Sequence, residues 1–374
     1  MAAPQLQFGS GRCSRGATCV TEQSISVIIP TFNRASLVTR AIRSALSAVD
    51  AGDEIIVVDD GSTDDTATAV AQFGDQIRYL RVSNRGPGAA RNYAIDRSTK
   101  PLISFLDSDD EWFPDKLRLQ RALLAARPHL VFCFSDFLLC AQDGHEERMY
   151  LRHWHGVNRE WSDILGAGAP FSSLAPLPAG RGDFLVHEGD LYPALISGPF
   201  VPAWTSLVRR AAAGDALRFA EDTRIGEDWE CFARLSRVGA AAYMACETAI
   251  NNSHPGARLT KSHNQLQLLD SRLRMTERVW GADTRFLETH AALYARTVSA
   301  IRYDRARWLL SRGRTAEARA ELRGLGGHLG ARTLSHLPPA LARTLGSSRR
   351  AAIAAIHAAL HLLPFIPEGI WPDL

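Results

Sequence analysis

Short apolar runs alternate with helical patterns through residues 24–137, and this alternation constrains the fold more than any other feature. Each run has the length of a strand, and the runs are residues 26–29, 54–58, 77–82, 102–106 and 130–134. The helical patterns between them cover residues 35–49, 64–73, 87–97 and 114–126. Apolar strands separated by helices are typical of a mostly parallel sheet that is covered on both faces. We therefore predict an α/β fold for this part of the chain.

The rest of the chain has a different character. Residues 138–262 are rich in Pro, Gly and Trp and carry no regular pattern, whereas helical spacing predominates from Asn264 onward. The stretch that begins at Trp308 predicts two helices joined by a tight turn. Residues 1–22 are polar and Gly-rich without an apolar stretch, so we expect a flexible lead there and not a signal peptide.

The composition narrows the class of protein. Hydrophobic residues make up 46% and charged residues 22% of the 374 residues, as in a globular protein of about two domains. The net charge of +3 is too small to favour nucleic acid as a partner. Because the six cysteines form no C-x-x-C pair, the sequence favours reduced thiols and a cytoplasmic location over a disulfide framework or a zinc site.

Polar side chains follow three of the predicted strands at the points where the strands end. They are Thr31 and Asn33 after the first strand, Asp59 and Asp60 at the second, and Asp107 and Asp109 after the fourth. Ligands of open α/β sheets bind outside the carboxyl ends of the strands. We therefore expect these side chains to share one rim of the sheet.

The segment Asp107-Ser-Asp-Asp-Glu111 holds four acids in five residues. Like charges this close repel by about 1 kcal/mol in water and by more in a partly dry site. A divalent cation relieves such repulsion, because Mg²⁺ commonly binds one or two carboxylates together with the phosphate oxygens of a substrate. The segment therefore predicts a divalent metal ion, Mn²⁺ or Mg²⁺, that binds together with an anionic substrate.

Several motifs occur in an order that points to one enzyme family. They are Val27-Ile-Ile-Pro-Thr-Phe-Asn-Arg34, Val57-Val-Asp-Asp-Gly-Ser-Thr-Asp64, Gly88-Ala-Ala-Arg-Asn92, Phe105-Leu-Asp-Ser-Asp-Asp110 and Gly226-Glu-Asp-Trp229. With them the chain resembles family 2 glycosyltransferases over about residues 24–262. The resemblance implies inverting sugar transfer and a Rossmann-like, A-type glycosyltransferase fold with a mostly parallel central sheet.

The resemblance also implies a division of the chain. We expect a glycosyltransferase domain at residues 23–262, preceded by the lead at 1–22 and followed by a C-terminal helical region at 263–374. Within the domain, residues 23–137 would form the nucleotide-binding half and residues 138–262 the acceptor-side half.

Roles for single residues follow from the same motifs, as implications of the likeness. The residues expected to bind the nucleotide-sugar are Pro30, Thr31, Asn33, Asp60, Arg91, Asp107 and Ser108. Asp109 would hold the metal together with Asp107, and His254 is a looser match for a third ligand. Asp228 matches the position of the catalytic base.

The implied reaction uses a nucleotide-diphosphate sugar, with a UDP-sugar favoured, and a glycan or lipid-linked acceptor. It would belong to polysaccharide or glycan biosynthesis of the bacterial type. Two alternatives remain open at the level of the sequence. One is a relative that binds a nucleotide-sugar or glycan without turnover, and the other is a phosphoryl-transfer enzyme on another doubly wound fold.

Several of these polar residues also have a purely structural interpretation. Ser62 or Thr63 could cap the helix that follows them, and Asp110 and Glu111 suit the start of the next helix. Aromatic and His side chains of the irregular zone could contact an acceptor or pack in a core; they are His153, Trp154, His155 and Trp161.

The role of the C-terminal tail is a separate question. Residues 330–367 contain arginines but no Asp or Glu, and residues 351–363 place apolar side chains on one face. That stretch is shorter than the roughly 20 apolar residues needed to cross a bilayer. We expect either peripheral contact with the inner face of the membrane or packing on the transferase domain.

Overall fold

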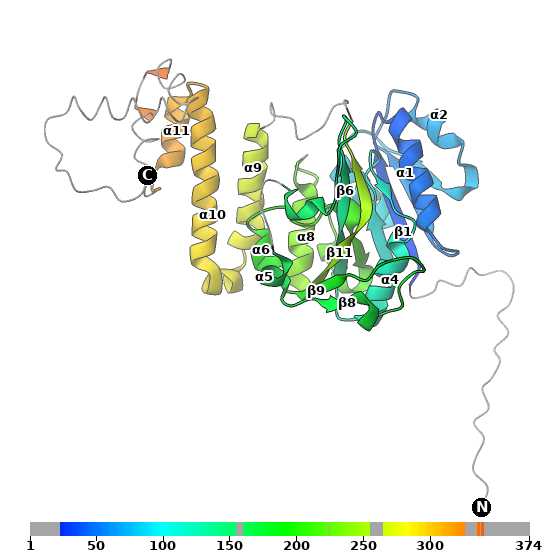
Figure 1. Ribbon diagram of the computed structural model, residues 1–374. Coiled ribbons are helices and arrows are strands. Elements are labelled where there is room, and N and C mark those ends of the chain that lie inside the picture. The colour runs from blue at the N-terminus through cyan, green and yellow to red at the C-terminus, as the bar shows by residue number, and fades with distance from the viewer. Residues whose placement is uncertain are drawn as a thin grey trace, which may run out of the picture.

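The structure is a computed structural model that describes residues 23–154, 160–223, 225–254, 265–325, 335, 336, 338 and 339. The predictions for the lead at 1–22, for His155 and for the apolar face at 351–363 lie outside the described residues. In Figure 1 a central sheet separates α1 and α2 at one end of the molecule from α9, α10 and α11 at the other.

The described strands form one mixed sheet, in the order β3-β2-β1-β4-β10-β6-β11-β9-β8. Its parallel part consists of β1 (Ile25–Thr31), β2 (Glu54–Asp59), β3 (Arg78–Arg81) and β4 (Leu102–Phe105). The short strand β10 (Leu207–Arg209) runs antiparallel between β4 and β6 (Phe132–Cys140). Beyond it, β11 (Ala241–Asn252) is parallel to β6, and β9 (Leu185–Gly189) and β8 (Ala169–Pro170) follow antiparallel. Two further short strands, β5 (Glu111–Trp112) and β7 (Glu146–Glu147), pair with β11 and β6.

The helices predicted in the first part of the chain are present. They are α1 (Ala35–Ala48), α2 (Thr66–Ala71), α3 (Pro87–Arg97) and α4 (Lys116–Ala126). Because β1 is buried along its whole length, its apolar run lacks the alternation of a half-exposed strand. The prediction of an α/β fold with a mostly parallel central sheet, followed by a helical region, is confirmed.

The description of residues 138–262 as irregular is wrong in one respect. This zone supplies β7 to β11 and the helix α8 (Glu227–Val238), besides the short helices α5 (Trp161–Leu165), α6 (Tyr192–Leu195) and α7 (Arg210–Ala213). The strand β11 begins Ala-Ala-Tyr-Met-Ala-Cys, which has no Val or Ile run. Its pairing with β6 on one side and β9 on the other makes it a strand, because strand preference depends strongly on neighbours.

The aromatic residues of this zone separate into core and periphery. Trp161 is 6% exposed and its ring stacks on Tyr243, with the ring centroids 4.1 Å apart. Trp154 is half-buried and packs edge-on against Phe137 and Trp204. Of the two interpretations of Trp161, packing in the core is therefore confirmed.

The C-terminal helices join the main core at their start. They are α9 (Gln265–Thr276), a π-helical turn (Glu277–Gly281), α10 (Thr284–Ser311) and α11 (Thr315–Leu322). Trp280 is fully buried in the main core, whereas Leu309 and Leu322 belong to a second, smaller cluster between α10 and α11. The predicted pair of helices joined by a tight turn is confirmed as α10 and α11. A domain boundary near residue 262 stays a prediction.

Replacing Trp280 with Ala should destabilise the protein by about 3–5 kcal/mol, as is usual when a large buried aromatic side chain is deleted. Trp280 stacks on Tyr192 and its Nε1 donates a hydrogen bond to the carbonyl oxygen of that residue. Urea unfolding measures the loss, with Trp308→Ala as the control, since Trp308 is only half-buried against the smaller cluster. Equal losses for both variants would contradict the assignment of α9 and the start of α10 to the main core.

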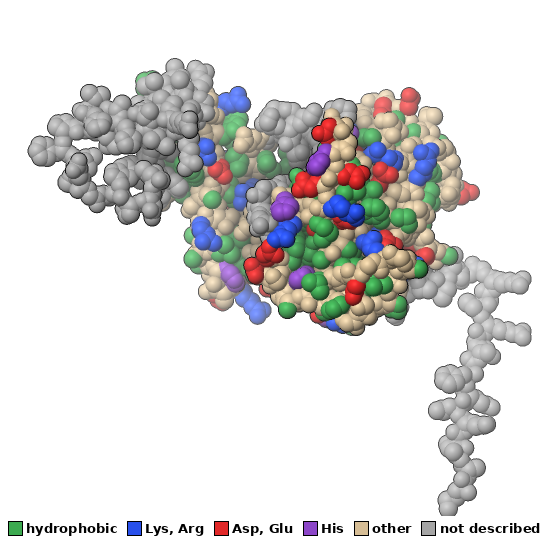
Figure 2. Space-filling view, in the orientation of Figure 1, with side chains coloured by type: hydrophobic (Ala, Val, Ile, Leu, Met, Phe, Trp, Pro, Cys, Tyr) green, Lys and Arg blue, Asp and Glu red, His purple; other side chains and the backbone are tan. Residues whose placement is uncertain are grey.

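Neither a membrane-spanning helix among the described residues nor a patch of one charge on the face drawn in Figure 2 is present. None of the described helices contains a stretch that is both long and apolar enough to span a bilayer. Figure 2 shows acidic and basic side chains mixed with apolar ones over the visible face. This mixture agrees with the small net charge of +3.

Candidate active site

The acids that follow β4 have separate partners, which explains how they can lie so close in sequence. Asp107 accepts a hydrogen bond of 2.7 Å from Nη2 of Arg91. Asp109 Oδ2 lies 2.8 Å from Nε2 of His254 and 3.8 Å from Nη2 of Arg34. Arg91 belongs to α3, whereas His254 follows the end of β11. The negative charges of Asp107 and Asp109 are therefore balanced by different side chains, Arg91 for Asp107 and His254 with Arg34 for Asp109.

The interpretation of Asp110 and Glu111 as a helix start is wrong. Asp110 is buried and accepts hydrogen bonds from the side-chain amide of Asn251 and the main-chain N–H of Asn252. Glu111 lies in β5 and forms an ion pair of 2.9 Å with Nε of Arg40. The helix α4 begins only at Lys116, so both acids instead tie the segment after β4 to β11 and to α1.

Arg91 joins the two acidic motifs of the site, which lie far apart in sequence. Its Nη1 donates to Oε1 of Glu227 at 2.8 Å, and Glu227 lies 136 residues further along the chain. The other terminal nitrogen binds Asp107, and the guanidinium lies over the ring of Phe219 at 5.0 Å. With a side chain only 5% exposed, Arg91 is an internal bridge between the end of β4 and the start of α8.

Asp228 lies in the first turn of α8, next to Glu227 of this bridge. Its Oδ1 accepts a hydrogen bond from the N–H of Trp229 at 2.8 Å. Burial raises the pKa of the Asp228 carboxyl, and the positive charge of Arg91 partly opposes that rise. Burial also raises the pKa of Glu227 to about 7, with the charge of Asp228 as the next cause. A carboxylate with a raised pKa accepts a proton more readily, as a general base requires.

The residues at the ends of β1 and β2 form the neighbouring part of the rim. Pro30 and Thr31 are buried, and the Thr31 hydroxyl has no hydrogen-bond partner among the described residues. Asn33 has a positive φ of 51°, and its side-chain oxygen accepts from the N–H of Thr63 at 2.8 Å. Asp60 accepts from the main-chain N–H groups of Arg85 and Gly86, each at 2.8 Å. These contacts connect the loops after β1, β2 and β3 around the ends of the strands.

The helix cap that the sequence suggested at Ser62 or Thr63 is absent from α2. The helix begins at Thr66, and Asp64 Oδ1 accepts from the Thr66 N–H at 3.1 Å. Ser62 instead donates its N–H to Asp59 and accepts from the N–H of Asn33. The hydroxyl of Ser62 is therefore used to hold the loop after β1.

Asp109 and His254 lie close enough together to share a metal ion, whereas Asp107, the other predicted ligand, is paired with Arg91. Asp109 and His254 come from segments 145 residues apart and meet at 2.8 Å. No group of three or more His, Cys, Asp or Glu side chains with metal-site geometry occurs in the part of the chain that the structure describes. Two protein ligands fit a cation that completes its shell with the oxygens of a diphosphate, whereas they do not fit a closed structural metal site.

Glu227 and Arg34 contact the predicted site residues but were not predicted themselves. The signal that could have found Glu227 is its place beside Asp228 in the motif Gly226-Glu-Asp-Trp229, whereas its pairing with the buried Arg91 is seen only in the structure. Ser108 is buried between Asp107 and Asp109. The roles of all these residues towards a ligand stay predictions.

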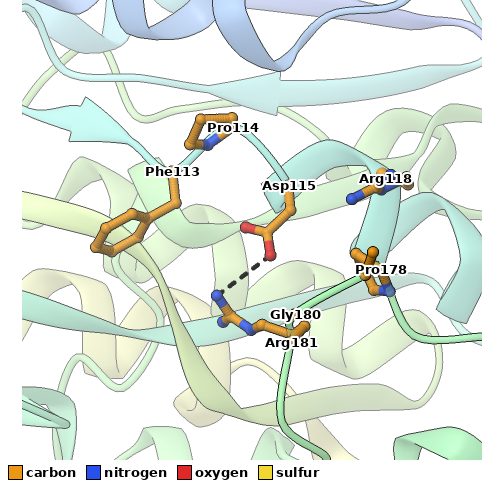
Figure 3. Close-up of a pocket in the computed structure, with 8 residues that line it drawn as sticks. Phe113, Pro114, Asp115, Arg118, Pro178, Gly180 and Arg181 are labelled. Carbon is orange, nitrogen blue, oxygen red and sulfur yellow. Dashed lines mark ion pairs between the residues drawn. The ribbon is translucent and has the colours of Figure 1, made fainter.

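A separate hollow of about 320 Å³ lies beside the start of α4. Figure 3 shows Phe113, Pro114, Arg118 and Pro178 around an ion pair of 3.2 Å between Asp115 and Arg181. None of the predicted site residues lines this hollow. Its residues therefore offer matched controls for experiments on the rim.

Comparison with known proteins identifies the class. The family model described as glycosyl transferase family 2 matches residues 26–161. The succinoglycan biosynthesis protein ExoU of Rhizobium meliloti is 30% identical over 261 residues, which cover 67% of this chain and 68% of that protein. An uncharacterized glycosyltransferase of Rickettsia conorii is 26% identical over 266 residues, covering 69% of this chain. The chain belongs to glycosyl transferase family 2, a family of sugar-transferring enzymes, which confirms the resemblance drawn from the motifs.

A solved structure supports the fold. S. aureus TarS 1-349, in complex with UDP-GlcNAc, superposes with a TM-score of 0.51 and 15% sequence identity, covering 83% of this chain and 90% of that chain. The chain spans only 42%, 33% and 33% of the length of three Rickettsia glycosyltransferases that it matches. More than half of each of those relatives therefore lies outside the region that aligns with this chain.

Proposed function

We propose that this chain transfers a sugar from a nucleotide-diphosphate sugar to an acceptor hydroxyl, with inversion at the anomeric carbon. The observation that supports this most is the bridge through Arg91, which links Asp107 after β4 to Glu227 and hence to Asp228. The two motifs to which we assign donor binding and the base are therefore in contact, although they lie far apart in sequence. In this proposal residues 23–137 form the nucleotide-binding half and residues 138–262 the acceptor-side half.

The donor would lie along the ends of β1, β2 and β4. Its nucleotide would contact Pro30, Thr31, Asn33 and Asp60, and its ribose or sugar would contact Asp107 and Ser108. The buried Thr31 hydroxyl supports a polar contact there, because a buried hydroxyl without a partner is costly unless a ligand satisfies it. A UDP-sugar is the donor that we test first.

Asp109 and His254 would hold a divalent metal, Mn²⁺ or Mg²⁺, with Asp107 as a further candidate ligand. When bound, the metal would act as a Lewis acid that offsets the charge on the departing diphosphate. The half-exposed carboxylate of Asp109 supports this role, since it can reach both His254 and a ligand at the rim.

Asp228 would act as the general base. It would take the proton from the acceptor hydroxyl while that oxygen attacks the anomeric carbon from the face opposite the nucleotide. A base held in this way typically contributes about 10²–10⁴-fold to the rate. The raised pKa of Asp228 supports the role, because it brings the carboxylate closer to the pH at which it must accept the proton.

The acceptor would be a glycan or a lipid-linked glycan in polysaccharide biosynthesis. The relative ExoU supports this through its description as a succinoglycan biosynthesis protein. We also propose a cytoplasmic site of action, where the C-terminal tail would either contact the inner face of the membrane or pack on the transferase domain.

A screen of UDP-, GDP- and dTDP-sugars with Mn²⁺ tests the proposal. Release of a nucleoside diphosphate that depends on an added glycan acceptor is the expected result. Release of inorganic phosphate would favour a phosphoryl-transfer enzyme instead. Saturable binding of a nucleotide-sugar without any turnover would favour a non-catalytic relative.

A further inference from the structure

The motif Gly88-Ala-Ala-Arg-Asn92 at the start of α3 has no role in the proposed reaction beyond the predicted contact of Arg91 with the nucleotide. We propose that Gly88, Arg91 and Asn92, the α3 clamp, position the segment 219–228 and thereby Asp228 against the loop of Asp107. The inference rests on the proposed function, because it deepens the role of Asp228. In this inference Arg91 is a positioning residue, which acts through the carboxylates of Asp107 and Glu227.

Asn92 holds the main chain of Phe219 from both sides. Its Nδ2 donates to the carbonyl oxygen of Phe219 at 2.9 Å, and its Oδ1 accepts from the N–H of Phe219 at 2.9 Å. The same Nδ2 also donates to Glu221 at 3.0 Å. Asn92 is only 7% exposed, so these bonds replace water contacts that its amide would otherwise make. A side-chain amide that pairs with both the N–H and the carbonyl oxygen of one residue fixes the position of that residue's main chain.

Gly88 allows α3 to lie against the next residue of the same segment. A Cβ atom at this position would stand 2.6 Å from the carbonyl oxygen of Ala220 and 3.4 Å from Cγ of Glu227. The first distance is a clash with backbone, which cannot turn aside as the end of a flexible side chain can. The absence of a side chain at Gly88 is therefore required by the close approach of α3 to residues 220–227.

Arg91 completes the clamp at the far end of the segment. Both of its terminal nitrogens bind protein carboxylates, one on Asp107 and one on Glu227. Its guanidinium also covers the ring of Phe219, which packs edge-on against Phe105 with the centroids 5.0 Å apart. The three clamp residues thus contact the segment at Phe219, at Ala220 and at Glu227. The last of these directly precedes Asp228.

This arrangement has a consequence for the rate of the reaction. Asp228 follows Glu227 directly, so a shift of the Glu227 backbone moves the proposed base. A displacement of about 1 Å at a reacting group can cost about 10²-fold in rate without loss of binding. The clamp should therefore influence the chemical step more than the affinity for the donor nucleotide.

The test compares Gly88→Ala with Gly182→Ala in the full chain. Gly182 is a matched control, because a Cβ there meets nothing within 4 Å and no positive φ is involved. We expect Gly88→Ala to lower kcat for sugar transfer by about 10²-fold, with KM for the donor and the affinity for nucleoside diphosphate unchanged. Gly182→Ala should match the wild type in all three quantities.

Two other variants keep the inference testable if Gly88→Ala folds poorly. Asn92→Ala should give the same fall in kcat, because it removes both bonds to Phe219 without touching the rim. Arg91→Lys keeps a positive charge near the rim but cannot bind both carboxylates in the same way, so it should also lower kcat while the affinity for nucleoside diphosphate stays unchanged. A parallel loss of nucleotide affinity and kcat in Gly88→Ala and Asn92→Ala would overturn the positioning role and favour direct contact of the motif with the nucleotide.

Amide hydrogen exchange separates failure of this inference from failure of the proposed function. If no donor is turned over by the wild type, the proposed function fails. The clamp is then judged by exchange in residues 219–230, which should be faster in Gly88→Ala and Asn92→Ala than in wild type and Gly182→Ala. Unchanged exchange in that segment, or unchanged kcat in an active enzyme, would overturn the clamp.

Discussion

Asp228→Asn is expected to lower sugar transfer by about 10²–10⁴-fold and to leave the affinity for nucleoside diphosphate and metal unchanged. Asparagine has nearly the same shape as aspartate, and its side-chain oxygen can still accept the hydrogen bond from the N–H of Trp229. It has no carboxylate to take the proton of the acceptor hydroxyl. Loss confined to the chemical step is the mark of an interaction made in the transition state.

The control for this experiment is Asp115→Asn. Asp115 is also a partly buried acid next to an arginine, but it pairs with Arg181 beside the hollow near α4 (Figure 3). Its replacement should leave turnover at the wild-type level. Full activity of Asp228→Asn would refute the base, and loss of nucleotide affinity together with the fold would make Asp228 a structural residue of α8.

Asp109→Asn should remove most of the dependence of nucleotide binding and turnover on Mn²⁺. Losing even an outer partner of a metal ligand typically costs about 10–100-fold in metal affinity or activity, and Asp109 would be a direct ligand. In the wild type, Mn²⁺ and nucleoside diphosphate together should raise the melting temperature. A ligand at 100 times its Kd stabilises a protein by about 2.7 kcal/mol.

The same measurements with EDTA provide the comparison for Asp109. The wild type in EDTA should resemble Asp109→Asn with Mn²⁺, because both lack the bound cation. Asp115→Asn with Mn²⁺ should resemble the untreated wild type. If chelation changes neither nucleotide affinity nor turnover in the wild type, the assignment of a metal to Asp109 is wrong.

The sequence was sufficient for the α/β half because β1, β2 and β4 each carry their own apolar run. In β1, for example, every residue is buried, so the local pattern and the final environment agree. The strand β11 has small residues in place of such a run, and its partners β6 and β9 are more than 50 residues away along the chain. A strand of this kind forms because neighbouring strands pair with it, and a single sequence does not reveal which distant segments pair.

For the site, the acids could be predicted but their partners could not. The end of β4 places Asp107 and Asp109 at the rim by topology alone. The partner of Asp110 is Asn251, which lies 141 residues further along the chain. No sequence motif around either residue indicates that the two are in contact. Likewise, the motif around Arg91 does not reveal that the two terminal nitrogens of this side chain bind Asp107 and Glu227. Its contact with the nucleotide stays a prediction.

The anomer of the first sugar released from an α-linked nucleotide-sugar tests the central proposal most directly. Water can take the place of the unknown acceptor, so the measurement needs only the enzyme, Mn²⁺ and the donor that the screen identifies. Proton NMR during the first turnovers, before mutarotation, should show the β-anomer together with nucleoside diphosphate, and Asp228→Asn should suppress both. Early release of the α-anomer, or release that is equally fast in Asp228→Asn, would contradict inverting transfer by this site.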